Sequence, residues 1–391
     1  MGGPTYNAVY LTRYMPDDYQ TLLVGGVKEA DEESSEYIAR NLGIEPVIIP
    51  EMHRQLSAQN DLIAYRKLTK IIRDFQPDIV HTHASKAGTV GRLAAIRSKV
   101  PVVVHTFHGH VFHSYFNSQE TKLFVNIERG LAERTTKIIA ISQKQKDELC
   151  GTFKIAPEEK FEVIPLGFDL QRFTENKPLR RAEFRQRYGI DDDEIAIGIV
   201  GRLAPVKNHK LFINAMAEIK RQTSRKIRAF VIGDGELMPD LEKQCNDLGL
   251  SYVHSCDGAA VAKADITFTS WIKNVEIAYP GLDIVAMTSL NEGTPVSLIE
   301  AQAANVPVIS TNVGGIENIV IPNDTAILAQ NGNVEDFVAK LLPMVNDSEM
   351  RQRMMANGWT FVKDRFHYTR LVGDMDNLYR KLLADAQKRR R

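Results

Sequence analysis

Short runs rich in β-branched residues alternate with segments of helical periodicity along almost the whole chain, and this alternation constrains the fold more than any other feature. In the first half, strands are predicted at residues 78–83, 100–107, 137–142 and 161–164. Helices are predicted at residues 61–75 and 120–134, and Tyr65, Leu68 and Ile72 share one face of the earlier helix. Such βαβ units form a parallel sheet whose ligand sites lie at the carboxyl ends of the strands.

The alternation stops at residues 165–169, where proline, glycine and aspartate precede a polar segment, and then restarts. Further strands are predicted at residues 195–200, 227–232, 265–269, 282–288 and 307–311. Further helices are predicted at residues 207–219, 236–248 and 295–304, and the chain is largely helical from about residue 334. With 391 residues, two domains fit. We predict an α/β protein with two Rossmann-like, doubly wound parallel-sheet domains facing across a cleft, over residues 1–168 and 169–366.

One expected element is missing from the first domain. A Rossmann-like domain opens with a buried strand that leads into a glycine turn. This chain opens at the turn itself, with Gly2 and Gly3 followed by Pro4. The sequence therefore predicts that the natural start lies upstream or that the first sheet lacks a central strand.

Composition and charge exclude several classes of protein. The 49 basic and 49 acidic residues cancel, which argues against a nucleic-acid binder driven by bulk positive charge. Three scattered cysteines, Cys150, Cys245 and Cys256, are too few for a disulfide framework or a cysteine zinc site. Without an apolar run of spanning length or a signal peptide, we expect a cytoplasmic protein. The basic end at residues 388–391 is interpreted as a solvated helix end, with contact to an anionic membrane surface as the alternative.

The strongest motif for chemistry spans residues 289–301, where a strand ends, a glycine loop follows and Pro295 is expected to open a helix. The free amides and the positive dipole end of such a helix suit a phosphate. Glu292 on the loop and Glu300 beyond the first turn are in position to accept hydroxyl groups of a ligand, as a carboxylate does for a ribose. For either glutamate alone, a surface position beside a capped helix would be the better interpretation. For the pair in this setting it is the weaker one.

A second motif, at residues 200–208, carries an arginine and a lysine directly after a buried strand. Arg202 as a bidentate fork and Lys207 as a mobile charge can both reach one diphosphate. The alternative is a solvent-facing loop. The glycines of residues 233–236 also follow a strand, and there a tight turn is at least as good an interpretation as ligand contact.

The first half is rich in histidine, at His81, His83, His105, His108, His110 and His113. A metal site is disfavoured because no acidic or cysteine partner is near in the sequence. His108 follows a strand at the edge where α/β sheets bind ligands, so a substrate role is predicted for it. His81 and His105 are interpreted as core or supporting residues.

Two other polar groups are weaker candidates. Ser85 and Lys86 follow a strand and would face a second substrate, although a plain connecting loop fits equally well. Residues 191–193 contain the Asp-x-Asp pattern that holds a divalent ion in metal-dependent sugar transferases. Here the pattern precedes a strand, at the wrong end for a ligand, and we interpret it as a solvated turn.

Three segments of the second half together resemble a known family: GRLAPVKN at residues 201–208, EGTPVSLIEA at 292–301 and PVISTNVGGIENIV at 307–320. With its two glutamates separated by seven residues, the chain is similar to the retaining glycosyltransferases of family 4, which have the GT-B fold. HTHASKAGTVGRLAA at residues 81–95 and HTFHGHVF at 105–112 resemble bacterial members that build surface polysaccharides. Asn305 stands where the family often has glycine.

The resemblance implies a nucleotide-diphosphate-sugar donor bound mainly by the C-terminal domain and an acceptor bound mainly by the N-terminal domain. It gives catalytic roles to His108, Glu292, Arg202 and Lys207. It assigns donor binding to Gly2, Gly3, Arg202, Lys207, Gly293, Thr294, Pro295, Val296 and Glu300. Ser85 and Lys86 are acceptor-side candidates, and a C-terminal helix over residues 367–391 is expected to cross back to the first domain.

The implied activity is sugar transfer with retention, without a metal or other cofactor, to a saccharide or lipid-linked saccharide acceptor in cell-surface polysaccharide synthesis. Fixed cations and a helix N-terminus would stabilise the leaving diphosphate in place of a metal. The resemblance further implies front-face attack and a location at or near the inner membrane face. Two alternatives stay open: a sugar-nucleotide epimerase of similar fold, and a nonenzymatic sugar-nucleotide-binding subunit.

Overall fold

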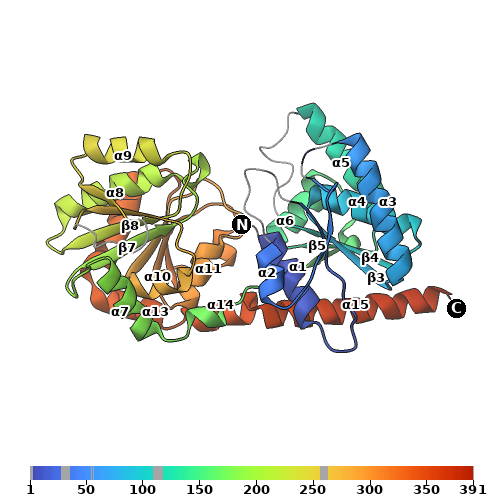
Figure 1. The fold of residues 1–391 in the computed structure, drawn as a ribbon. Coiled ribbons are helices and arrows are strands. Elements are labelled where there is room, and N and C mark those ends of the chain that lie inside the picture. The colour runs from blue at the N-terminus through green and yellow to red at the C-terminus, as the bar shows by residue number, and fades with distance from the viewer. Residues whose placement is uncertain are drawn as a thin grey trace. The chain divides into compact units, whose positions relative to one another are not determined.

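The computed structural model describes residues 3–27, 36–53, 55, 57–108, 118–255 and 263–390. The chain divides into two compact units (Figure 1). One comprises residues 1–168 together with 365–391, and the other comprises residues 169–364. The C-terminal segment therefore belongs to the same unit as the N-terminus.

The first unit is built around parallel strands with helices between them. Its elements in chain order are α1 (Gly3–Tyr14), β1 (Val24–Gly26), α2 (Glu36–Asn41), β2 (Val47–Ile49), α3 (Ala58–Phe75), β3 (Ile79–His83), α4 (Ser85–Arg97), β4 (Val102–Phe107), α5 (Ser118–Arg134), β5 (Lys137–Ala140), α6 (Gln143–Asp147) and β6 (Phe161–Val163). Strands β3, β4, β5 and β6 form one parallel sheet in that order, and β1 pairs with β2 separately. Neighbouring strands of the larger sheet are parallel and follow one another in chain order, as the alternation of strands and helices predicts.

Helix α15 (Tyr368–Arg390) completes the core of the first unit. Its apolar residues Leu371, Met375 and Leu378 pack with Val102 and Val104 of β4. The GT-B expectation of a C-terminal helix that returns to the first domain is therefore met.

Glycine at position 167 lets α15 begin close to the chain that leaves the first unit. A Cβ on Gly167 would lie 2.7 Å from the Cβ of Leu371 and 2.9 Å from the Cα of Tyr368. The backbone of Phe168 bonds to that of Phe366 at 2.8 Å and to that of Tyr368 at 3.0 Å. The backbone that leaves the first unit at residue 168 therefore lies beside the backbone that returns to it at residues 366–368.

The second unit contains a parallel sheet with the order β13-β12-β11-β7-β8-β10-β9. Its strands are β7 (Ile195–Val200), β8 (Ile227–Ile232), β9 (Tyr252–His254), β10 (Ile266–Ser270), β11 (Ile284–Met287), β12 (Val308–Thr311) and β13 (Ala326–Ala329). Its helices are α7 (Lys177–Arg187), α8 (His209–Gln222), α9 (Met238–Asp247), α10 (Val275–Gly281), α11 (Val296–Ala303), α12 (Val334–Asn346) and α13 (Ser348–Met355), and α14 (Gly358–Phe366) leads back to the first unit. The central strands are almost wholly buried, as expected for a parallel sheet covered on both faces.

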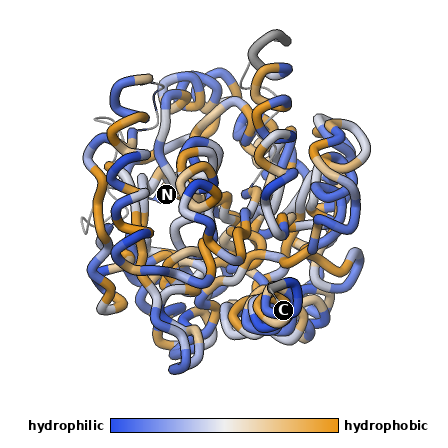
Figure 2. The backbone as a smooth tube through the Cα atoms, turned by 90° about the vertical axis from the view of Figure 1, so that its right-hand side faces the viewer, coloured by the Kyte–Doolittle hydropathy of each residue, from blue (hydrophilic) through white to orange (hydrophobic). Residues whose placement is uncertain are grey.

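Hydrophilic and hydrophobic residues are interspersed along the helices (Figure 2), as expected where one face of a helix covers a sheet. In α8, for example, Leu211, Phe212 and Ile219 are buried in the core of the second unit.

Several expected boundaries are wrong by a few residues. The helix expected from Lys207 begins at His209, because Asn208 adopts a left-handed conformation (φ 48°) and Lys207 closes a short 3-10 turn, Pro205–Lys207. Pro295 precedes α11 as its N-cap residue (φ −72°, ψ 105°) and is not its first helical residue. Gly3, expected in a turn, begins α1, and Gly2 lies outside the described residues. Asn305 is left-handed (φ 58°), a conformation that asparagine tolerates where the family often has glycine.

Candidate functional site

The two strongest motifs of the second unit meet at the carboxyl edge of its sheet. Lys207, after β7, contacts Glu292, after β11, with 2.5 Å between Nζ and Oε1. Ser289 donates its hydroxyl hydrogen bond to the same Oε1 at 2.6 Å. Both charged side chains are mostly buried, 26% and 10% exposed for Lys207 and Glu292. The loops that carry them are also joined by a backbone bond of 2.8 Å from the amide of Leu290 to the carbonyl of Val206.

A third loop, residues 312–315, supports the loop of Glu292 from the next strand. The amide of Gly315 donates to the carbonyl of Glu292 at 3.0 Å. A Cβ on Gly314, which has φ 56°, would lie 1.8 Å from the carbonyl oxygen of Glu292. A Cβ on Gly315 would lie 2.1 Å from the carbonyl oxygen of Gly293. Only a pair of glycines allows this backbone-to-backbone contact.

Helix α11 starts at this loop, with Gly293, Thr294 and Pro295 leading into Val296. No side chain among the described residues caps its N-terminus. The first amides of the helix and its positive dipole end are therefore available to an anion at the side of the Lys207–Glu292 pair.

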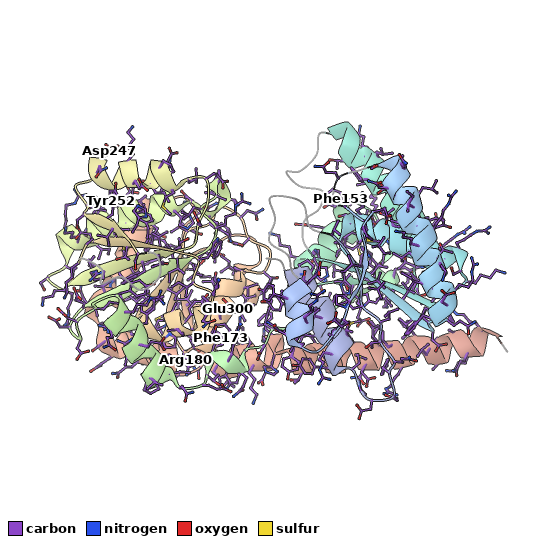
Figure 3. The ribbon with its side chains drawn as sticks, in the orientation of Figure 1. Phe153, Phe173, Arg180, Asp247, Tyr252 and Glu300 are labelled. Carbon is purple, nitrogen blue, oxygen red and sulfur yellow. The ribbon has the colours of Figure 1, made fainter. Side chains whose placement is uncertain are left out.

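Glu300 lies one turn further along α11 and is held at both carboxylate oxygens. Tyr279 of α10 donates its hydroxyl hydrogen bond to Oε2 at 2.8 Å. Arg172 of a short 3-10 turn, Gln171–Phe173, lies 3.7 Å from Oε1 through its Nη2. Figure 3 labels Glu300 and the neighbouring Phe173 in the second unit. Burial raises the pKa of Glu300 to about 7, although the charge of Arg172 and the Tyr279 hydrogen bond lower it.

Arg202 has a different partner from Lys207. It forms an ion pair with Glu236, 3.2 Å between Nη2 and Oε2, and both side chains are exposed. The turn at residues 233–236 lies under the Arg202 loop, since the amide of Leu203 donates to the carbonyl of Asp234 at 3.0 Å. This turn therefore has a supporting role in the loop, in line with its interpretation as a tight strand-to-helix turn.

In the first unit, a group of histidines gathers at the carboxyl ends of β3 and β4. The Nδ1 of His83 lies 2.8 Å from the Nε2 of His108, so one ring donates and the other accepts. His81 is hydrogen-bonded to Tyr379 of α15 at 2.6 Å and to Thr106 at 2.7 Å. Burial lowers the pKa of each of these histidines, that of His83 to about 4, so the group is neutral at pH 7.

The structure places three of the other first-unit candidates, His105, Lys86 and Ser85. His105 is 1% exposed and hydrogen-bonded to Thr82 at 2.9 Å, which makes it a core residue as expected. Lys86 forms an ion pair with Asp61 of α3 at 2.6 Å. Ser85 is the exposed first residue of α4. His110 and His113 lie outside the described residues.

Two absences concern the described residues alone. Over residues 3–27, 36–53, 55, 57–108, 118–255 and 263–390, histidine, cysteine, aspartate and glutamate side chains do not gather in threes or more in a way that would hold a metal ion. The Asp-x-Asp pattern lies in the turn before β7, where Asp191 forms an ion pair with Lys263 and Asp193 forms one with Lys226. In the same part of the chain, no helix combines the length and the apolar character needed to span a bilayer.

Sequence reasoning missed several residues of this site, among them Arg172 beside Glu300. Ser289 and Tyr279 contact the two glutamates, and Gly314 and Gly315 hold the loop between them. Gly314 and Gly315 were part of a recognised segment, but the sequence gives no sign of which backbone they touch. Tyr279 lies in α10, a helix that the sequence analysis does not predict, and nothing in its neighbouring residues indicates a contact with Glu300.

Two family models match the chain almost from end to end. The model described as Glycosyltransferase Family 4 matches residues 1–172, and the model described as Glycosyl transferases group 1 matches residues 180–360. Two Rossmann-like parallel-sheet units with a C-terminal helix that returns to the first unit define the GT-B class of glycosyltransferases. The chain is a glycosyltransferase of this class, with a first half that matches the Family 4 model and a second half that matches the group 1 model.

Curated relatives are similar over most of their length. The UDP-Gal:alpha-D-GlcNAc-diphosphoundecaprenol alpha-1,3-galactosyltransferase of Escherichia coli is 29% identical over 334 residues, covering 85% of this chain and 82% of that protein. The capsular polysaccharide biosynthesis glycosyltransferase CapM of Staphylococcus aureus is 24% identical over 341 residues, covering 87% and 86%. Among solved structures, Anabaena Alr3699/HepE in complex with UDP superposes with a TM-score of 0.78 at 19% identity, covering 97% of this chain and 96% of that chain. That likeness supports the fold.

Proposed function

We propose that this protein transfers a sugar from a uridine-diphosphate-sugar donor to a lipid-linked saccharide, with retention of configuration and without a metal ion, in the synthesis of a cell-surface polysaccharide. The observation that carries the proposal is the Lys207–Glu292 pair at the uncapped start of α11, with Glu300 on the same helix. The similarity to the Escherichia coli galactosyltransferase, whose name specifies a UDP-linked donor and a diphosphoundecaprenol-linked acceptor, supports the choice of substrates.

On the donor side, each group has a distinct task. Lys207, the amides that open α11 and Arg202 stabilise the negative charge that develops on the leaving diphosphate. Glu300 accepts hydrogen bonds from the ribose hydroxyls, and Glu292 contacts the donor sugar. Because Lys207 is paired with Glu292 and Arg202 with Glu236, both cations would share or exchange these partners when the diphosphate binds beside the start of α11.

In the transfer itself, the bond between the sugar C1 and the donor phosphate oxygen breaks, and a bond forms between C1 and the acceptor oxygen. The proton of the acceptor hydroxyl passes to the leaving diphosphate. Attack from the same face as the leaving group retains the configuration. No carboxylate nucleophile is required, and the stabilised diphosphate oxygen serves as the base.

Metal independence rests on the cations and dipole of the second unit. Lys207, Arg202 and the α11 amides supply the electrostatic stabilisation that a divalent ion supplies in other sugar transferases. We assign His108 to the donor sugar and Ser85 and Lys86 to the acceptor. Because Lys86 is paired with Asp61, it would have to exchange that partner for an acceptor group.

A lipid-linked acceptor requires the enzyme to work beside a membrane. We propose a cytoplasmic enzyme at the inner membrane face, with the basic residues at 388–391 as a candidate contact. Binding to anionic vesicles, compared between the whole chain and a variant with these four residues changed to alanine, tests that part of the proposal.

The central experiment combines binding and transfer in the presence of EDTA. Calorimetric titration with uridine, guanosine, adenosine and thymidine diphosphates is expected to give tight binding of the uridine compound. Glu300→Ala should lose that binding, and Glu349→Ala, whose side chain is 84% exposed on α13, should keep it. Arg202→Ala should mainly lower turnover.

Three outcomes of this experiment would contradict the proposal. A requirement for a divalent ion would remove metal independence. Transfer products of inverted configuration would remove retention. Interconversion of donor isomers without an acceptor would favour an epimerase.

A further inference from the structure

We infer that the Tyr279 hydroxyl positions the Glu300 carboxylate for the two vicinal hydroxyls of a ribose, so that this tyrosine sets the preference of the enzyme for ribonucleotide over deoxyribonucleotide donors. The inference rests on the proposed function, in which Glu300 binds the donor ribose. It concerns a residue that makes its contribution through Glu300.

The hydroxyl of Tyr279 is committed to Glu300. Tyr279 is fully buried in α10, and its hydroxyl donates to Oε2 of Glu300 at 2.8 Å. Burial beside this carboxylate raises the pKa of the tyrosine, which keeps the hydroxyl protonated and a donor. A hydroxyl buried in apolar surroundings is costly unless it is paired, so this hydrogen bond accounts for a tyrosine where phenylalanine would otherwise pack.

The ring of Tyr279 is held independently of its hydroxyl. Its centroid lies 5.6 Å from that of Phe173 in an edge-to-face arrangement. The guanidinium of Arg172, which lies over the Phe173 ring at 4.8 Å, approaches the other carboxylate oxygen of Glu300 at 3.7 Å. The carboxylate is thus held from two elements, α10 and the 3-10 turn that follows the first unit.

This arrangement leaves the carboxylate able to accept two further hydrogen bonds. Each carboxylate oxygen has two acceptor directions. With one direction of Oε2 used by Tyr279 and Oε1 paired with Arg172, each oxygen keeps a free direction for a ligand hydroxyl. Two adjacent hydroxyls on a ribose match two oxygens of one carboxylate, whereas a deoxyribose offers only one. Loss of the Tyr279 hydrogen bond frees the carboxylate to rotate and weakens the match.

The experiment uses the whole chain and compares binding of UDP and 2′-deoxy-UDP by wild type, Tyr279→Phe and Glu300→Gln. Wild type should prefer UDP, and Tyr279→Phe should lower that preference about tenfold, the effect of one hydrogen bond to a charged group. The matched control is Tyr188→Phe, which removes the hydroxyl of another buried tyrosine of the second unit, packed against Phe184 and Phe230. It should leave the preference unchanged. Melting temperatures verify that each variant is folded.

The possible results separate this inference from the proposed function. If Glu300→Gln loses the preference and Tyr279→Phe keeps it, the inference is overturned and the proposed donor site stands. If Tyr279→Phe weakens the binding of UDP and of 2′-deoxy-UDP equally, the tyrosine has only a packing role and the inference is likewise overturned. If wild type binds neither nucleotide, the proposed function fails and this inference fails with it.

Discussion

At the scale of single residues, Glu300 has the environment with the clearest functional consequence. Burial raises its pKa to about 7, and the groups that face it are Arg172, Tyr279 and Glu276. Near neutral pH the carboxyl therefore changes between a protonated acid and a carboxylate. Only the carboxylate accepts hydrogen bonds at both oxygens, and such charge-assisted bonds are the stronger ones.

Nucleotide affinity should therefore rise with pH. Between pH 6 and pH 8 the ionised fraction of a group with a pKa of about 7 increases about tenfold, and UDP affinity should increase by about the same factor. Titrations of wild type and Glu300→Gln across this range measure the effect. Ionisation of the UDP phosphate affects both proteins alike, so the difference between them reports Glu300. A parallel pH dependence in both would contradict the assignment.

The same carboxyl has a consequence for stability with a defined sign. Its folded-state pKa of about 7 lies above the ordinary value of 4.5. Its contribution to stability is therefore complete below about pH 4.5 and is lost as the pH rises through 7. In thermal unfolding without ligand, Glu300→Gln should melt at or above the wild-type temperature at pH 8. A clear loss of stability at pH 8 would indicate that Arg172 and Tyr279 stabilise the charge more than burial opposes it.

At the scale of elements, the donor loop depends on a neighbouring loop with glycine at two positions. Gly315→Ala would bring a Cβ to 2.1 Å from the carbonyl oxygen of Gly293, so the loop of Glu292 must move. A displacement of about 1 Å at a reacting group lowers turnover about 100-fold, and we expect that loss in kcat/KM. Steady-state kinetics with a UDP-sugar donor measure it.

Gly373→Ala is the control for Gly315→Ala, because a Cβ at position 373 contacts no other atom. Gly373 lies exposed within α15, and a Cβ there has no atom within 4 Å. Alanine in a helix interior should raise the unfolding free energy by about 0.5–1 kcal/mol and leave kinetics unchanged. Equal losses of activity in both glycine variants would show that the assay reports general damage and not the donor loop.

The elements that could be predicted from the sequence are those whose environment appears in their own residues. Strands such as β7, β8 and β12 are continuous buried runs, and α3 repeats its apolar residues at helical spacing. Strands of three residues are too short to have a period: of these, β6 coincides with a predicted strand, and β1, β2 and β9 do not. Helix α10 ends in proline and glycine, residue types that argue against a helix. The sequence therefore does not predict the helix that carries Tyr279.

For the site, the sequence predicts residues that share one motif, but it does not predict the distant residues that contact them. Glu292 and Glu300 share one motif, so their common helix was foreseeable. The ion pair of Glu292 with Lys207 and the contact of Glu300 with Tyr279 join residues that only the sheet order brings together. The same applies to His81, whose partner Tyr379 comes from the other end of the chain.

At the scale of the whole molecule, the first unit is built from two separate stretches of the chain, one on each side of the second unit in the sequence. The second unit is one continuous stretch, residues 169–364, whereas the first unit needs residues 365–391 in addition to 1–168. Leu371, Val372, Met375, Leu378 and Leu382 of α15 are buried in the core of the first unit. At about 1.5 kcal/mol for each of the five side chains, they contribute about 7.5 kcal/mol, comparable to the ~5–15 kcal/mol that stabilises a whole domain.

The two units should therefore respond differently to being cut apart. Residues 169–364 alone should fold, melt cooperatively and bind UDP with nearly the affinity of the whole chain, because the contacts of Lys207, Glu292 and Glu300 all lie within this stretch. Residues 1–168 alone should lack cooperative unfolding and regain it when a peptide of residues 365–391 is added. Circular dichroism melting and calorimetry measure both effects. Cooperative melting of residues 1–168 without the peptide would show that α15 is an accessory of the first unit, and loss of UDP binding by the isolated second unit would show that its donor site needs residues outside 169–364.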